Sequence, residues 1–387
     1  MRIGLITGEY PPLRGGVGDF TRQLALALVA AGHDVHVLTT TRAQPAPADA
    51  GIAVDPVIAR WGWRSLWAAR RWAASNRLDV VNVQYQAAMY GLTAPIHFLP
   101  DVVGRPTVAT FHDLRIPYLF PKAGPLRNAA VTHLAARACA AIATDPADAR
   151  TLRARGVRAV SQIPIGSNIA ARAPEGFDRV GWRSARGYAA DDFVIGYFGF
   201  LNDSKGGDTL IDALADLVAR GIPAHVLLIG GAAGASDPTE VAFGARVAER
   251  IQALALTERV QRTGFLPEAD TSAALLACDV MALPYRDGAS LRRGTLMAAL
   301  AHGLPIVSTL GEDQVVELRD GEAVRLVRPG AATELAEALA VLRTDPQQRE
   351  RLGRGARALS GRFGWDAIAA ETAQVLAACC VGTMVTS

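Results

Sequence analysis

Short apolar, β-branched runs alternate with alanine- and leucine-rich stretches along almost all of the 387 residues. The short runs have the length and the bounding turn residues of strands, whereas the longer stretches carry apolar residues at helical spacing. Strands that alternate with helices form a parallel sheet covered on both faces, and such a sheet binds ligands at the carboxyl ends of its strands. The runs predicted as strands are 3–7, 35–39, 52–57, 80–83, 107–111, 141–144 and 161–165, then 193–198, 224–229, 260–263, 280–283, 306–308 and 323–327.

The alternation is interrupted once, after Ile169. Residues 170–192 mix glycine, proline and charged residues without a clear period, and we interpret them as an interdomain linker. The alternation then restarts, which predicts an α/β fold of two Rossmann-like domains that face a cleft. The domain bounds are placed at 1–175 and 176–365.

The composition excludes several classes of protein. Half of the residues are hydrophobic and 20% are charged, which excludes a disordered chain. No stretch approaches the roughly 18 uncharged apolar residues of a spanning helix, and the apolar run within residues 1–8 is too short for a signal peptide. The net charge of +3 lacks the basic stripe of a nucleic-acid-binding protein. The four cysteines have no metal-site or disulfide spacing, so we expect a reducing, cytoplasmic setting.

The first of three glycine-containing loops, residues 8–18, follows the first predicted strand. Gly15 and Gly16 precede a predicted helix, where backbone N–H groups and the helix dipole favour a phosphate. A phosphate contact and a plain strand-to-helix turn both remain open. The spacing does not match the GxGxxG motif, which argues against a nicotinamide dehydrogenase.

The second and third loops add positive charge at helix starts. In residues 199–208, Lys205 precedes two glycines, where an ammonium group neutralises a diphosphate as a point charge; the alternative is a solvated lysine. Residues 284–295 follow another strand, and their last four side chains form a candidate diphosphate cradle or, alternatively, a loop with two solvated arginines. These four residues are Arg292, Arg293, Gly294 and Thr295.

Among the seven histidines, His112 is the best candidate for a functional role because it ends a predicted strand. Asp113 follows it, but adjacent side chains on a strand point to opposite faces, so we do not predict a His–Asp relay. Neither HExxH nor GxSxG occurs, and no metal site is predicted.

Residues 60–72 form a basic, tryptophan-rich stretch with two interpretations. It either lies on an anionic membrane surface, or it is a helix that packs its tryptophan face on the sheet and leaves its arginines in water. We favour the packed helix, because aromatic stripes are usually core, and keep a peripheral membrane contact as the alternative.

Taken together, seven segments in register across almost the whole chain resemble a family 4 (group 1) retaining glycosyltransferase of the GT-B fold. The segments are 15–20, 84–86, 111–113, 163–168, 199–206, 263–265 and 301–305. Three positions depart from the family pattern. The arginine that usually stands five residues before the diphosphate lysine is Phe200, and two glutamates that usually contact the donor sugar and the ribose are Ser290 and Ala298.

The resemblance implies a hexosyltransferase that moves a sugar from a nucleotide-diphosphate donor to an acceptor hydroxyl with retention. The donor would bind the domain at 176–365. The acceptor, a saccharide or a lipid-linked or small molecule, would bind the domain at 1–175, and a terminal helix within 366–387 would pack back on that first domain. Neither a cofactor nor a metal is expected, since the sequence lacks the DxD motif with which the other common transferase fold holds a metal.

The same resemblance assigns roles to individual residues. Lys205 and Arg293, then Arg292, would bind the leaving diphosphate beside the amides of Gly15 and Gly16, and the two arginines would replace charge lost at Phe200. His112 would contact the sugar or the attacking hydroxyl. The remaining predicted cleft residues are Gln84, Gly199, Phe200, Ser290 and Ala298. The alternative function is a catalytically degenerate GT-B protein that acts as a binding or partner protein, while an epimerase of the same fold is disfavoured because the glutamates are missing.

Overall fold

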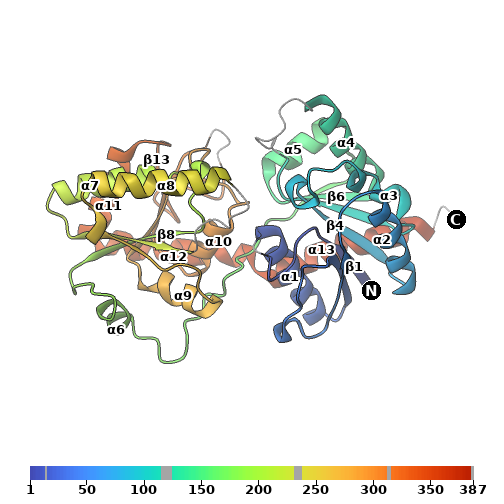
Figure 1. Ribbon diagram of the computed structural model, residues 1–387, viewed down its shortest axis with the longest axis horizontal. Coiled ribbons are helices and arrows are strands. Elements are labelled where there is room, and N and C mark those ends of the chain that lie inside the picture. The colour runs from blue at the N-terminus through green and yellow to red at the C-terminus, as the bar shows by residue number, and fades with distance from the viewer. Residues whose placement is uncertain (14, 115–123, 231–237, 312–314, 385–387) are drawn as a thin grey trace. The chain divides into compact units, whose positions relative to one another are not determined.

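The computed structural model describes residues 1–13, 15–114, 124–230, 238–311 and 315–384, and it divides into two compact units (Figure 1). The first unit comprises Met1–Gly166 together with Phe363–Ser387, and the second comprises Ser167–Arg362. Each unit is a Rossmann-like α/β domain with a parallel sheet, so the prediction of two such domains is confirmed.

The first unit contains a parallel sheet of seven strands among its described residues, in the order β3-β2-β1-β4-β5-β6-β7. Its central strands are almost fully buried apolar runs, because helices cover both faces. The strands are β1 Arg2–Ile6, β2 Asp34–Thr40, β3 Ile52–Ile58, β4 Val80–Tyr85, β5 Thr107–Phe111, β6 Ala140–Ala143 and β7 Val160–Gln162. The helices are α1 Gly16–Ala30, α2 Trp63–Ser75, α3 Leu99–Val102, α4 Gly124–Arg137, α5 Pro146–Ala154 and α13 Trp365–Met384, with 3-10 turns η1 Pro47–Asp49, η2 Ala87–Tyr90 and η3 Pro95–Phe98.

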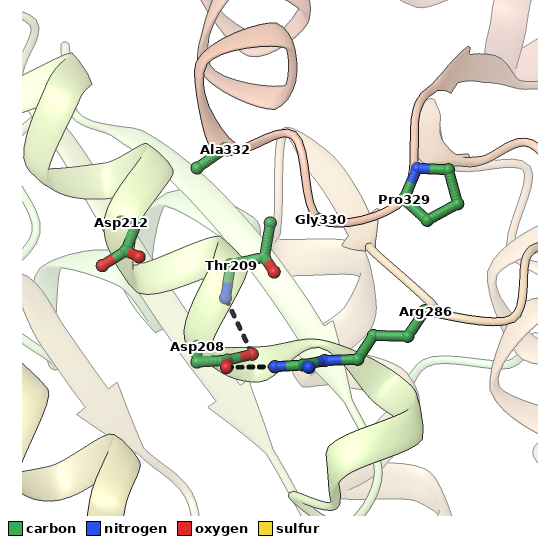
Figure 2. A pocket seen from close by; sticks show the side chains of 7 residues that line it. All are labelled: Asp208, Thr209, Asp212, Arg286, Pro329, Gly330 and Ala332. Atoms are coloured by element: carbon green, nitrogen blue, oxygen red, sulfur yellow. Dashed lines mark hydrogen bonds and ion pairs between the residues drawn. The ribbon is translucent and has the colours of Figure 1, made fainter.

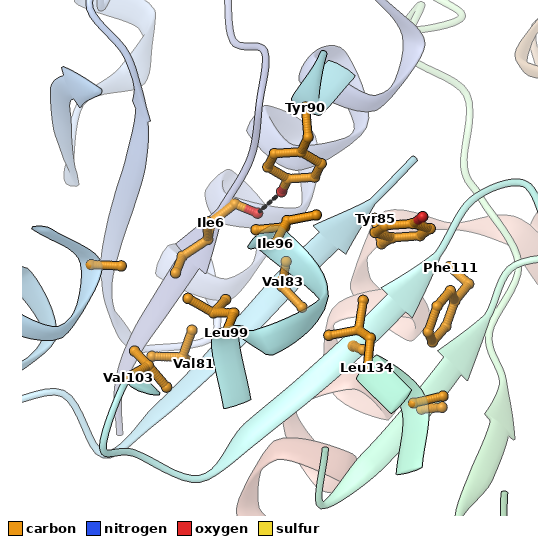
Figure 3. Packing of buried hydrophobic residues seen from close by; sticks show 14 of the residues in the cluster. Ile6, Val81, Val83, Tyr85, Tyr90, Ile96, Leu99, Val103, Phe111 and Leu134 are labelled. Atoms are coloured by element: carbon orange, nitrogen blue, oxygen red, sulfur yellow. Dashed lines mark hydrogen bonds between the residues drawn. The ribbon is translucent and has the colours of Figure 1, made fainter. Parts of the chain in front are cut away.

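Alternating side chains of these strands enter two separate cores, as the pleat requires. Val81, Val83 and Tyr85 point to the face covered by α2 to α5, where Tyr90 lies beside them and donates its hydroxyl to the Ile6 carbonyl at 3.1 Å (Figure 3). The residues that alternate with these along the strands point to the other face, which α1 and α13 cover.

The last helix of the chain, α13, belongs to the first unit. Its Ile368 and Leu376 are buried in one cluster with Phe20 and Leu24 of α1. The first unit is therefore completed by a segment that follows the whole second unit in the sequence.

The second unit contains a parallel sheet of six strands among its described residues, in the order β10-β9-β8-β11-β12-β13. Helices α7, α8 and α11 supply much of the core that covers one face of this sheet. The strands are β8 Phe193–Phe198, β9 Ala224–Ile229, β10 Val260–Arg262, β11 Val280–Leu283, β12 Ile306–Thr309 and β13 Arg325–Val327. The helices are α6 Arg179–Ser184, α7 Gly207–Ala219, α8 Pro238–Ala253, α9 Glu268–Ala277, α10 Gly294–Ala301, α11 Ala332–Thr344 and α12 Pro346–Ser360, with 3-10 turns η5 Asp203–Lys205, η6 Thr257–Arg259 and η7 Gly361–Phe363.

Residues 170–192, interpreted above as a linker, belong to the second unit and contain the short helix α6. The Asp178 carboxylate caps this helix by accepting hydrogen bonds from the Val180 and Gly181 amides. Arg183 holds it in place through an ion pair of 2.6 Å with Asp279. A helix this short has too few turns to show a period in sequence, and a long-range ion pair fixes it instead.

The tryptophan-rich segment corrects the prediction of a helix that packs its tryptophans on the sheet. Trp61 and Trp72 are buried as predicted, but the side chains of Trp63 and Trp67 on α2 are 59% and 58% exposed. A helix has only one face toward the sheet, so tryptophans spread around α2 cannot all reach the core. Within the described part of the chain, no helix combines the length and apolarity needed to cross a membrane.

Candidate functional site

Two loops at the carboxyl ends of β8 and β11 meet in the second unit around Lys205. A Cβ atom on Gly199, the residue after β8, would lie 2.9 Å from the Lys205 Nζ atom and 2.8 Å from the Thr295 methyl group. The structure thus brings together two predicted residues of the loop after β8 and one from the start of α10. The Lys205 Nζ atom also lies 5.8 Å from the centre of the Phe200 ring, which occupies the position of the family's arginine.

Backbone contacts fix this arrangement. Gly206 lies between the 3-10 turn η5 and α7, caps both, and has its backbone in the left-handed region, with φ of +63°. A Cβ atom on Gly206 would lie 2.0 Å from the Pro284 carbonyl oxygen, so only glycine allows the two loops to approach this closely. The Arg286 amide donates to the Ser204 carbonyl at 2.9 Å and ties the loops together a second time.

Side chains of the second unit hold Arg293, which directly precedes α10, in place. The Arg293 guanidinium is bonded to the Asp287 carboxylate and lies 4.8 Å from the centre of the Tyr285 ring. The Tyr285 hydroxyl in turn shares a hydrogen bond of 2.6 Å with Thr295. Arg293 therefore already has an anionic partner, which the sequence reasoning did not foresee, and its assignment to a diphosphate stays a prediction.

Three side-chain atoms of this segment are buried without a hydrogen bond to any described residue. They are the Ser290 hydroxyl and the Nε atoms of Arg292 and Arg293. Buried polar atoms without partners are costly, and they gather where a polar ligand satisfies them. Ala298, by contrast, is fully buried within α10 and offers no polar group.

In the first unit, the predicted residues Gln84 and His112 are in direct contact. His112 follows β5, is 8% exposed, and its Nε2 atom lies 2.8 Å from the Gln84 Oε1 atom. Burial lowers the pKa of His112 to about 3, with a smaller opposing effect of the Asp113 charge, so the ring is neutral at physiological pH. His112 thus serves as a neutral hydrogen-bonding group and not as a cation.

A chain of side-chain hydrogen bonds fixes which ring nitrogen of His112 carries the proton. The Val108 carbonyl oxygen only accepts, so Asn82 presents its Nδ2 atom there, at 3.2 Å, and its Oδ1 atom to the Gln84 Nε2 group. Gln84 must then present Oε1 to His112, and an oxygen requires a donor. The neutral ring therefore carries its proton on Nε2 and its lone pair on Nδ1.

Replacing Asn82 by leucine is expected to disturb this tautomer although Asn82 has no hydrogen bond to His112. The change removes the acceptor that orients Gln84, so the Gln84 amide can rotate and the Nδ1–H tautomer becomes populated. The measurement is ¹⁵N spectroscopy of the histidine rings, with His112→Asn to assign the signal. Thr144→Val, which removes a buried hydroxyl hydrogen-bonded to the Phe111 carbonyl, is the control and should leave the tautomer unchanged. A wild-type His112 ring protonated on Nδ1 would contradict this order of hydrogen bonds.

The glycine loop of the first unit contains a group that the sequence reasoning missed. Gly15 caps α1, and the Glu9 carboxylate accepts hydrogen bonds from the Val17 and Gly18 amides at 3.2 and 3.1 Å. A Cβ atom on Gly15 would lie 2.1 Å from this carboxylate, whereas Gly16 has open space beside it. Burial raises the pKa of Glu9. Two of the first amides of α1 are thus satisfied within the chain, so a phosphate contact of Gly15 and Gly16 stays a prediction.

Comparisons with known proteins agree with this picture. The model of Glycosyltransferase Family 4 matches residues 14–170, and that of Glycosyl transferases group 1 matches residues 192–345. The chain belongs to the family 4, group 1 glycosyltransferases. The predicted resemblance is confirmed.

Named relatives match this glycosyltransferase over about half of its length or over almost all of it. A phosphatidyl-myo-inositol mannosyltransferase of Mycobacterium leprae is 27% identical over 97% of this chain and 96% of its own. A D-inositol 3-phosphate glycosyltransferase of Corynebacterium efficiens is 30% identical over 55% of this chain and 49% of its own.

Two solved structures have the same fold as this glycosyltransferase. Anabaena HepE in complex with UDP and glucose has a TM-score of 0.78 and 22% identity, covering 98% of this chain and all of its own. Sucrose-phosphate synthase of Thermosynechococcus elongatus has a TM-score of 0.77 and 23% identity, covering 97% of this chain and 98% of its own.

A separate hollow of about 440 Å³ opens in the second unit of this glycosyltransferase (Figure 2). The start of α7 and the segment before α11 line it, with Arg286 reaching in from the loop after β11 and binding Asp208. None of the predicted site residues lines it, and its two carboxylates and its guanidinium are already paired. The converging loops around Lys205, rather than this hollow, are the candidate donor site.

Proposed function

We propose that this glycosyltransferase moves a hexosyl group from a nucleotide-diphosphate sugar to an acceptor hydroxyl, with retention and without a metal ion. The observation that carries the proposal is the meeting of Lys205, Gly199 and Thr295 at the carboxyl edge of the second sheet. A cation, a close-approaching backbone and a helix start are together suited to a diphosphate. The proposal includes a cytoplasmic setting.

The comparisons support the choice of donor. HepE was solved with UDP and with UDP-glucose, and the mycobacterial relative is named as a mannosyltransferase. We assign the donor to the second unit, where Lys205 lies, and the acceptor to the first unit, where His112 lies. The acceptor is a saccharide, a lipid-linked molecule or a small molecule.

In the proposed reaction the acceptor oxygen bonds to the anomeric carbon on the face from which the diphosphate leaves. The bond from the anomeric carbon to the phosphate oxygen breaks, and the acceptor proton passes to that phosphate oxygen. Negative charge grows on the diphosphate as the bond breaks, so a pre-placed ammonium stabilises the transition state more than the ground state. The bare Nδ1 atom of neutral His112 accepts a hydrogen bond from a sugar or acceptor hydroxyl.

A binding protein with a degenerate site is the second candidate, and specific observations favour it. Ala298 is buried and has no polar group for a ribose, and Arg293 is already bonded to Asp287. Such a protein would bind a nucleotide without turnover.

A thermal-shift panel of UDP, GDP, ADP, TDP and their common sugars separates these candidates. A ligand at 100 times its Kd adds about 2.7 kcal/mol to the free energy of unfolding, so we expect one base to raise the Tm clearly. The shift should persist in EDTA. Release of nucleotide diphosphate from the matching sugar, and the anomeric configuration of the product by NMR, then test transfer and retention. A shift without release in the presence of candidate acceptors favours a nucleotide-binding protein. No shift with any nucleotide contradicts the transfer reaction and favours a partner protein that has lost its donor site.

A further inference from the structure

The outward face of α2 exposes two large aromatic side chains one turn apart. Trp63 and Trp67 stand four residues apart on this helix and are more than half exposed. Full burial of a tryptophan is strongly favourable, so two neighbouring exposed indoles are a marked departure for a protein surface. The Trp63 ring also contacts the Phe98 ring, with 5.4 Å between the ring centres, which extends the aromatic surface toward η3.

The same face carries only positive charge. Residues 56–78 contain five arginines and neither aspartate nor glutamate. Arg60, Arg64, Arg70 and Arg71 are exposed, and the Arg70 guanidinium lies 5.8 Å from the centre of the Trp67 ring. None of these four arginines forms an ion pair with a described residue. Their charges therefore remain available to an anionic partner.

The neighbouring helix does not cancel this charge. Asp101 on α3, which contacts α2, is bonded to His133 at 2.7 Å and to Arg137 at 2.5 Å. Both partners lie on α4 and hold the pKa of the Asp101 carboxyl below its usual value. The carboxylate of the adjoining surface is thus already paired and does not oppose the arginines of α2.

The inward face of α2 anchors the helix firmly in the first unit. Leu66, Ala69 and Ala73 are buried in the core below the sheet, and the Trp72 Nε1 group donates to Asp55 at 2.8 Å. Because the helix is held by a complete apolar face of its own, Trp63 and Trp67 cannot turn inward. The exposed indoles are thus a fixed property of the surface.

We infer that this face, formed by Arg60, Trp63, Arg64, Trp67, Arg70 and Arg71, docks on an anionic lipid surface. A helix that lies in the membrane plane places indole rings at the headgroup level and arginines against lipid phosphates. Adjacent exposed indoles favour lipid over nucleic acid, since a duplex is bound mainly through phosphate contacts. The inference does not depend on the proposed donor, and it places the first unit where a lipid-linked acceptor is available.

The test is co-sedimentation of the whole protein with phosphatidylcholine vesicles that contain or lack phosphatidylglycerol. We expect binding only to the anionic vesicles, weakened by salt, with a blue shift of tryptophan fluorescence. Arg64→Glu with Arg71→Glu should lower the partition coefficient about tenfold or more. Trp63→Ala with Trp67→Ala should remove most of the blue shift and weaken binding.

The matched control is Arg351→Glu with Arg354→Glu, which makes the same charge change on exposed positions of α12 in the second unit. It should bind vesicles as the wild type does. Circular dichroism shows that each variant is folded. Equal binding to neutral vesicles, equal loss in the control, or unchanged binding of the α2 variants would overturn the inference. Binding of duplex DNA that the α2 changes abolish, without vesicle binding, would overturn it in favour of a nucleic acid.

Discussion

Lys205→Ala should lower kcat by about a hundredfold to a thousandfold, the usual loss when one pre-placed group that stabilises transition-state charge is removed. The ammonium and the Thr295 methyl group both lie beside Gly199, where we place the leaving diphosphate. Since the charge develops during bond cleavage, kcat should fall more than KM rises. The Tm should change little, because the side chain is not part of either core. Steady-state kinetics with the donor identified by the nucleotide panel, together with thermal unfolding, measure both effects.

Two variants make this result specific. Lys205→Arg keeps the charge but changes its geometry, so we expect partial activity. Arg220 directly follows α7, is exposed and is paired with Asp216. Arg220→Ala removes this cation and should leave kcat unchanged. A Lys205→Ala enzyme with wild-type turnover would remove Lys205 from the reaction and leave the binding-protein function as the better explanation.

Gly206→Ala is expected to destabilise the second unit by about 3 kcal/mol. The left-handed backbone costs an alanine about 1–2 kcal/mol, and the clash with the Pro284 carbonyl oxygen adds a similar amount. For a unit of this size the Tm should fall by about 6–12 °C in calorimetry. Turnover should fall too, because the displaced loop carries Lys205.

Gly221→Ala is the matched control for the backbone effect. Gly221 also has a positive φ, of +77°, but a Cβ atom at this position would have no described atom within 4 Å. The substitution should therefore cost only the backbone penalty of about 1–2 kcal/mol and leave turnover intact. Equal losses in the two variants would show that the close approach of the two loops contributes nothing.

Much of the fold could be predicted because parallel sheets have a strong sequence signal. Strands such as β4 and β5 are buried on both faces, so their apolar runs stand out between helical stretches. The position of His112 followed from the same logic, since ligands bind where such strands end. That Lys205 and Thr295 both lie near Gly199 could also be predicted in part, because their loops follow β8 and β11, which are neighbouring strands.

The missed features all depend on contacts that form only when the chain folds. Asp287 is an ordinary loop residue until Arg293 folds back onto it, and Asn82 reads as a polar interruption of a strand until its partners on β5 are known. Glu9 had one local signal, because it is an acid within the glycine-containing loop that follows a buried strand. The exposure of Trp63 and Trp67 could not be predicted from residue type, because it depends on which side of α2 the sheet lies.

The return of α13 to the first unit has a consequence for how the protein is made. The ribosome completes β1 to β7 before it reaches the second unit, but α13, the helix that shields Phe20 and Leu24, is synthesised after that unit. All of Ser167–Arg362 must be translated in between, which takes about 10–40 s at ordinary elongation rates. Throughout that interval the nascent chain carries an uncovered apolar stripe along α1, and the first unit reaches its native state only after the second has left the ribosome.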